Sequence, residues 1–105
     1  DYGRYLREHL CGLRNQRTHI ISRDTAEFLH HPQAGSDAAL GWGRYEFGEI
    51  PASIHVGGTG TFSAFVAVLP TQDLAIATVT NSGATESRGA ALTLFQAIVA
   101  ERTAQ

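Results

Sequence analysis

The sequence predicts an α+β fold, an antiparallel β-sheet meander packed by N-terminal helices and a C-terminal helix. Two apolar runs, residues 62–69 and 74–80, have the length and composition of buried strands. Pro-Thr-Gln-Asp separates them, and these residue types favour a tight turn. Apolar side chains recur with a helical period at both ends of the chain, and a length of 105 residues suits one domain.

The first helix is expected over residues 1–13, because apolar side chains recur there on one helical face. Asp1 is a suitable N-cap, and Gly12 is a suitable stop signal. His9 lies on the apolar face and is expected to pack rather than to bind a metal, since no second ligand lies one turn away. The face consists of Tyr2, Leu6, His9, Leu10 and Leu13.

The second helix is expected over residues 22–31. Ser22 can cap its start, and Pro32 ends it because the residue before a proline avoids the helical region. His30 and His31 are neighbours, so their side chains diverge by about 100° on a helix and do not share a metal ion easily. We therefore expect both histidines at the surface.

The remaining elements follow from strand alternation and from one further helical stripe. Residues 39–47 alternate with aromatic side chains on both faces, and residues 48–51 form a turn. Near the C-terminus, an apolar stripe predicts a helix that lies across the sheet. The strands are expected at about 39–47, 52–57, 62–69 and 74–80, and the last helix at 86–102.

The composition argues against several classes of function. A net charge of −2 and a pI near 6.2 give no electrostatic basis for binding nucleic acid or an anionic membrane. No run approaches the roughly 20 apolar residues of a membrane-spanning helix. Five histidines lack the spacing of a metal site, so no metal or cofactor is expected, and one cysteine allows no internal disulfide. The composition does not indicate a cellular compartment.

The candidate site is the strand that runs into Gly57-Gly58-Thr59-Gly60. Alternation puts His55 and Gly57 on one face, and Gly58 offers an N–H that no side chain shields. An imidazole beside a bare amide suits binding of an oxyanion. The other interpretation is that His55 is a half-buried packing residue and the glycines form a bulge. A dinucleotide fingerprint is not matched, because Ser63 stands where its third glycine is required.

These residues resemble a known family. The run HVGGTGTFSAFVAVLP, followed by DLAIATVTN and a helix, is similar to the C-terminal portion of serine β-lactamase-like proteins. That family includes class C β-lactamases, penicillin-binding DD-peptidases and related esterases, and many members carry H-x-G in place of the K-T-G box. Residues 1–12, 21–32 and the Leu-Gly-Trp at 40–42 resemble, in order, what precedes that box. The resemblance implies that residues 1–105 are a single C-terminal segment of a β-lactamase-like domain.

The resemblance also implies a function, acyl transfer by a serine hydrolase acting on a β-lactam, a D-amino-acid peptide or an ester. His55 would occupy the third-motif position, and the Gly58 amide would be one oxyanion-hole donor, so these two are the implied catalytic residues. Gly57, Thr59 and Asn81 would contact the substrate. Because histidine is largely neutral where lysine is a cation, we expect a preference for ester or peptide substrates over anionic β-lactams.

Two motifs of that family are missing from these residues. The chain contains no lysine and therefore no S-x-x-K, and no tyrosine is followed by asparagine two positions on. We expect the chain to be inactive alone, with the serine supplied by a missing N-terminal segment. The alternative is a non-catalytic fragment or degenerate homologue that binds a ligand or a protein, including a second copy of itself through an exposed sheet edge.

Overall fold

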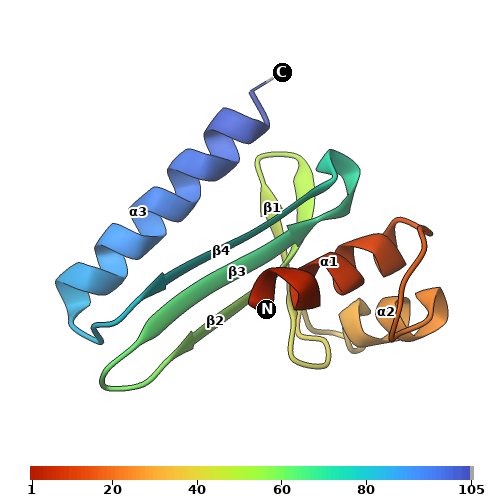
Figure 1. Cartoon of the computed structure of the whole chain (residues 1–105), viewed down its shortest axis with the longest axis horizontal. Helices are drawn as coiled ribbons and strands as arrows, with labels where there is room; N and C mark the ends of the chain where they lie inside the picture. Colours follow the sequence, from red (N-terminus) through yellow and green to blue (C-terminus); the bar gives the residue numbers. More distant parts are fainter. Residues whose placement is uncertain (105) are drawn as a thin grey trace.

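The computed structural model describes residues 1–104, which form three α-helices and a four-stranded antiparallel sheet (Figure 1). The predicted α+β class is confirmed. A short 3₁₀ helix, η1, joins the last two strands. The elements are α1 (Tyr2–Leu13), α2 (Arg23–His30), β1 (Gly43–Phe47), β2 (Ile50–Gly58), β3 (Ser63–Leu69), η1 (Pro70–Gln72), β4 (Leu74–Thr80) and α3 (Thr85–Arg102).

The sheet is a meander with the strand order β1-β2-β3-β4, as the sequence predicts. β1 and β2 are joined by two residues, and Gly48 at the first of them has φ 66°, as in a type II′ hairpin turn. β3 and β4 are joined through η1 and Asp73, which has a left-handed backbone with φ 51°. The turn predicted at residues 70–73 is therefore confirmed.

Each face of the sheet is covered by different helices. Successive side chains of β3 point to opposite faces, so this strand contributes to both apolar clusters. The cluster under α3 consists of Ala52, Ala67, Leu69, Ile76, Phe95 and Val99. The cluster under α1 consists of Leu6, Leu10, Trp42, Val66 and Val68. Each fully buried Val or Leu side chain contributes about 1.5–3 kcal/mol, so β3 anchors both layers.

Two strand boundaries differ from those predicted. The first strand begins at Gly43 rather than near residue 39, because Gly41 takes φ 84° and interrupts the extended backbone. β2 begins at Ile50, so Pro51 lies inside a strand instead of in the turn. Pro51 is tolerated there because β3 pairs with β2 only from Ser53 onward, so the missing N–H lies outside that ladder.

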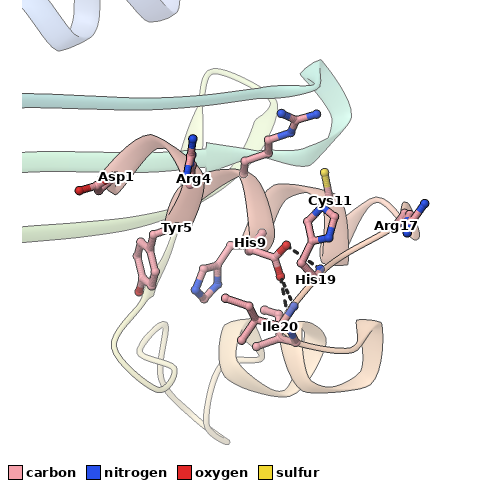
Figure 2. A pocket seen from close by; sticks show the side chains of 11 residues that line it. Asp1, Arg4, Tyr5, His9, Cys11, Arg17, His19 and Ile20 are labelled. Carbon is pink, nitrogen blue, oxygen red and sulfur yellow. Dashed lines mark hydrogen bonds between the residues drawn. The ribbon is translucent and has the colours of Figure 1, made fainter.

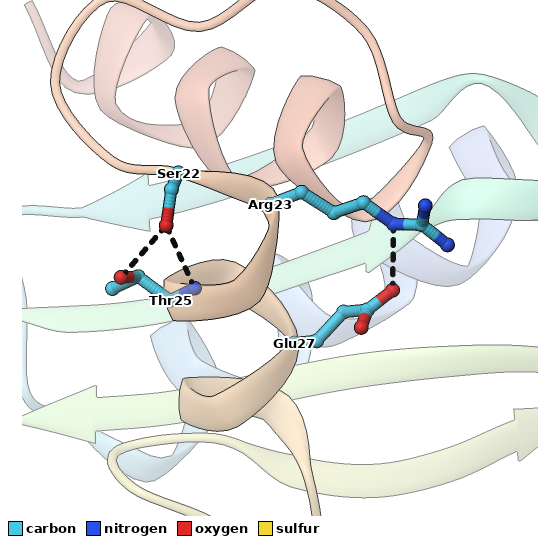
Figure 3. Close-up of polar contacts among 4 residues, drawn as sticks. All are labelled: Ser22, Arg23, Thr25 and Glu27. Carbon is cyan, nitrogen blue, oxygen red and sulfur yellow. Dashed lines mark hydrogen bonds and ion pairs between the residues drawn. The ribbon is translucent and has the colours of Figure 1, made fainter.

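The helix ends show one confirmed cap and two corrections. Ser22 caps α2 as predicted, because its Oγ accepts a hydrogen bond from the Thr25 N–H at 3.1 Å (Figure 3). Asp1 sits at the N-cap of α1 without a side-chain cap bond. Gly12 does not stop α1 but lies buried inside it, where a Cβ would come within 2.6 Å of the Ala26 Cβ. Gly12 is thus a contact point between α1 and α2.

No helix among residues 1–104 is both long enough and apolar enough to span a membrane.

Candidate functional site

The predicted site lies where β2 extends beyond β1. The last residue of β2 that pairs with β1 is Ile54, whose partner is Gly43. From His55 to Gly58, β2 pairs only with β3 within residues 1–104, and in Figure 1 this end of β2 runs past β1 toward the turn into β3. We call residues 55–58 the β2 edge, because one side of the strand is open there.

The direction of the Gly58 amide follows from the pairing. The Thr59 N–H donates to the Phe62 carbonyl at 2.9 Å, which makes these two a hydrogen-bonded pair in the antiparallel ladder. Bonded pairs recur every second residue, so His55 and Gly57 also direct their backbone groups toward β3. The Gly58 N–H therefore points away from β3 and out of the open edge, where the residue is exposed.

His55 is exposed and lies on the same face as Gly57, as predicted from alternation. A Cβ placed at Gly57 would lie 3.5 Å from the His55 Nε2, so the imidazole lies along the strand above the glycine. The pairing stays regular through Gly57–Ala64 and Gly58–Ser63, which excludes a bulge. The interpretation of His55 as a half-buried packing residue is wrong.

Thr59 uses its hydroxyl within the turn between β2 and β3. Its Oγ1 accepts hydrogen bonds from the N–H groups of Thr61 at 3.1 Å and Phe62 at 3.2 Å, and it also bonds to the Thr61 hydroxyl at 3.1 Å. These contacts occupy the donor and both lone pairs of a hydroxyl. A substrate would have to displace one of them, so the predicted contact between Thr59 and substrate stays a prediction.

Asn81 lies in the loop that follows β4, and this loop is held against the same turn. A Cβ placed at Gly83 would lie 2.5 Å from the Gly60 carbonyl oxygen and 2.7 Å from that of Thr59. Ser63 also donates from Oγ to the Ser82 carbonyl at 3.4 Å. The fold thus brings exposed Asn81 to the end of the sheet that carries the β2 edge.

Two concavities of the described chain lie away from the β2 edge. One of about 900 Å³ lies between α1 and residues 17–21 (Figure 2). There the Glu8 carboxylate accepts backbone N–H groups from His19, Ile20 and Ile21, and Arg4 and Arg17 point away from each other. The other, of about 440 Å³, lies between α2 and the β1–β2 hairpin. Neither concavity is lined by a residue of the β2 edge.

A histidine pair that the sequence did not reveal joins α1 to α2. His9 Nδ1 lies 2.8 Å from His30 Nε2, and both rings contact buried Trp42, with centroid distances of 5.1 and 4.5 Å. Burial, and to a smaller extent the neighbouring His9, lowers the pKa of His30 to about 4. Burial also lowers the pKa of His9, which Glu8 partly offsets. The expected surface position is wrong for His30 and right for His31.

Metal binding finds no support in the geometry. Within residues 1–104, no group of three His, Cys, Asp or Glu side chains lies close enough to hold a metal ion.

No family of proteins, curated protein or solved structure was found to match the chain. What the site offers is an exposed imidazole and an outward backbone N–H on one open edge.

Proposed function

We propose that the β2 edge contacts the substrate in a serine hydrolase that transfers the acyl group of a β-lactam, a D-amino-acid peptide or an ester. The observation that carries this proposal is the Gly58 N–H, which points outward beside exposed His55. A bare amide in this orientation is what an oxyanion hole requires. The resemblance of residues 55–81 to the third-motif region of serine β-lactamase-like proteins supports the same function.

The chemistry divides between this chain and the segment that carries the serine. As the serine attacks the acyl carbonyl, negative charge develops on the carbonyl oxygen, and Gly58 N–H donates a hydrogen bond to it. A donor of this kind contributes about 10²–10³ in rate. His55, three residues earlier on the strand, hydrogen-bonds the substrate and helps to orient proton transfer. A histidine in place of the cationic lysine of the K-T-G box favours ester and peptide substrates over anionic β-lactams.

The experiment compares the chain alone with the same chain joined to a segment that bears S-x-x-K. The chain alone should not be labelled by a fluorophosphonate. The joined protein should hydrolyse p-nitrophenyl acetate, and His55→Ala should lower kcat/KM by about 10-fold to 100-fold. Labelling of residues 1–105 alone, or an unchanged kcat/KM in His55→Ala, would contradict the proposal. Nitrocefin turnover faster than ester turnover would contradict the predicted substrate preference.

A second candidate function is protein interaction through β4. Within residues 1–104 this strand pairs only with β3, and its seven residues carry no charge and no proline. Val79 on this strand is 65% exposed. An uncharged open edge readily accepts another strand. If this is the function, the chain should self-associate with rising concentration in sedimentation experiments, and Val79→Lys should abolish the association; a monomer at every concentration would exclude pairing with a second copy.

A further inference from the structure

We propose that Gly83 is a positioning residue for the β2 edge. Its bare Cα lets the loop after β4 pack against the β2–β3 turn, and this contact holds the turn, and with it the Gly58 amide, in place. The proposal rests on the proposed function of the β2 edge and adds to it the group that holds the oxyanion donor in place. Gly83 itself touches no substrate in this scheme.

The contact at Gly83 is one of backbone against backbone. A Cβ there would lie 2.5 Å from the Gly60 carbonyl oxygen, 2.6 Å from the Gly60 carbonyl carbon and 2.7 Å from the Thr59 oxygen. Gly83 does not have a positive φ, so a side chain is excluded by space and not by backbone conformation. Because the neighbours are carbonyl groups, no rotamer change can make room.

The turn transmits this contact to Gly58. Thr59 N–H is bonded across the turn to the Phe62 carbonyl, and the Thr59 hydroxyl accepts two further N–H groups of the same turn. A Cβ at Gly58 would lie 3.2 Å from the Phe62 oxygen, so Gly58 is packed against the same carbonyl. Ser63 Oγ bonds to the Ser82 carbonyl at 3.4 Å and supplies a second link between loop and strand. These contacts link Gly58 and the turn to the loop that contains Gly83.

Gly83→Ala should displace the turn. Carbon atoms prefer separations of about 3.5–4.0 Å, so a new methyl group 2.6 Å from the Gly60 carbonyl carbon requires a shift of roughly 1 Å. A misplacement of that size can lower a rate by about 10²-fold. In the protein that carries the serine, Gly83→Ala should lower kcat by about 10-fold to 100-fold and leave KM little changed, because the amide acts on the transition state.

Gly60→Ala is the matched control. Gly60 lies in the same turn, has no positive φ, and a Cβ there would meet nothing within 4 Å. The same change of glycine to alanine should therefore leave kcat and the turn unaltered. A fall in kcat equal to that of Gly83→Ala would show that the turn tolerates no alanine at all, and would overturn the specific role of Gly83.

The direct measurement is an amide NMR spectrum of the chain with each variant. Gly83→Ala should move the Gly58 and Thr59 amide resonances and speed hydrogen exchange at Thr59 N–H, whereas Gly60→Ala should do neither. If Gly83→Ala does not fold, Ser63→Ala removes the second link and should shift the same resonances in a folded protein. Unmoved Gly58 and Thr59 resonances in the folded variants overturn the proposal.

The kinetic and spectroscopic results separate the two proposals. If the amide moves and the unmutated joined protein has no hydrolase activity, the proposed function fails while the structural role of Gly83 stands. If the joined protein is active and Gly83→Ala moves the amide without changing kcat, the orientation of Gly58 by Gly83 has no part in the reaction, and the positioning role fails.

Discussion

The packing of α1 against α2 depends on the absence of a side chain at Gly12, and Gly12→Ala tests this contact. Gly12 is buried, and a Cβ there would come within 2.6 Å of the Cβ of fully buried Ala26. Two methyl groups prefer a separation of about 3.5–4.0 Å, so the helices must separate by roughly 1 Å. Overpacking destabilises the protein by about 1–3 kcal/mol, while replacing glycine by alanine inside a helix stabilises it by up to about 1 kcal/mol.

We expect Gly12→Ala to lower the free energy of unfolding by about 1–2 kcal/mol in urea denaturation followed by circular dichroism. For a domain of this size each kcal/mol lowers Tm by about 4–8 °C. The double variant Gly12→Ala, Ala26→Gly should recover part of the lost free energy of unfolding, with a coupling energy between the two substitutions of about 1–2 kcal/mol. Gly3→Ala is the control on the same helix, since a Cβ there meets nothing within 4 Å and should stabilise the protein by up to about 1 kcal/mol. If Gly12→Ala is stabilising as well, α1 and α2 do not meet at this point.

Two further predictions concern titratable groups around α1. The lowered pKa values of His9 and His30 mean that the folded state binds fewer protons than the unfolded state, so their contribution is full above about pH 6.5 and is lost as the pH falls toward about 4. Allowing for partial solvent exposure, the loss at His30 is about 1–2 kcal/mol, and His30→Phe should flatten the pH dependence of urea midpoints; an equal slope in the variant would contradict this. Burial by itself raises the pKa of Glu8, but three backbone N–H donors hold that pKa below its ordinary value. Glu8→Gln should therefore speed amide hydrogen exchange at Ile20, and unchanged exchange would refute the role of the carboxylate. In the unmutated chain, protection of the loop from exchange should fall as the pH drops below about 4.5, and the variant should not show this pH dependence.

The sheet could be predicted from the sequence because its signals are local. β3 and β4 are continuous apolar runs, and the turn between them contains Pro70 and Asp73, whose backbone preferences suit that turn. Alternation also gave the correct relative faces of His55 and Gly57. These features depend on residues that are neighbours in the chain, so spacing was sufficient.

The wrong predictions concern residues whose surroundings are set by contacts between elements that are distant in the sequence. Gly12 has the residue type of a helix stop, but its role is to admit Ala26 from another helix, which no local pattern reveals. His30 was expected at the surface because its spacing excluded chelation with His31, yet its partner is His9, 21 positions earlier. The strand predicted near residue 39 failed at Gly41, whose left-handed backbone was not anticipated.

The candidate site shows the same division. The sequence indicated the imidazole and the bare amide, but the opening of the β2 edge depends on where β1 begins, at Gly43, and that boundary was the least accurate of the strand predictions. The support from Gly83 was not foreseen either, because Gly83 and Gly60 are brought together only by the fold.

The most direct test of the account removes the outward N–H of Gly58 itself. Proline has no N–H and is tolerated on an open strand edge, so Gly58→Pro removes the donor without breaking a bond to β3. Val56→Pro is the control for loss of an outward N–H elsewhere on the same edge. Gly58→Ala keeps the donor and controls for the new Cβ, which would lie 3.2 Å from the Phe62 carbonyl oxygen. In the protein joined to its serine-bearing segment, Gly58→Pro should lower kcat for ester hydrolysis by about 10²–10³ while Val56→Pro retains most of it. Equal activity of Gly58→Pro and the unmutated protein would contradict the role of this amide as an oxyanion donor.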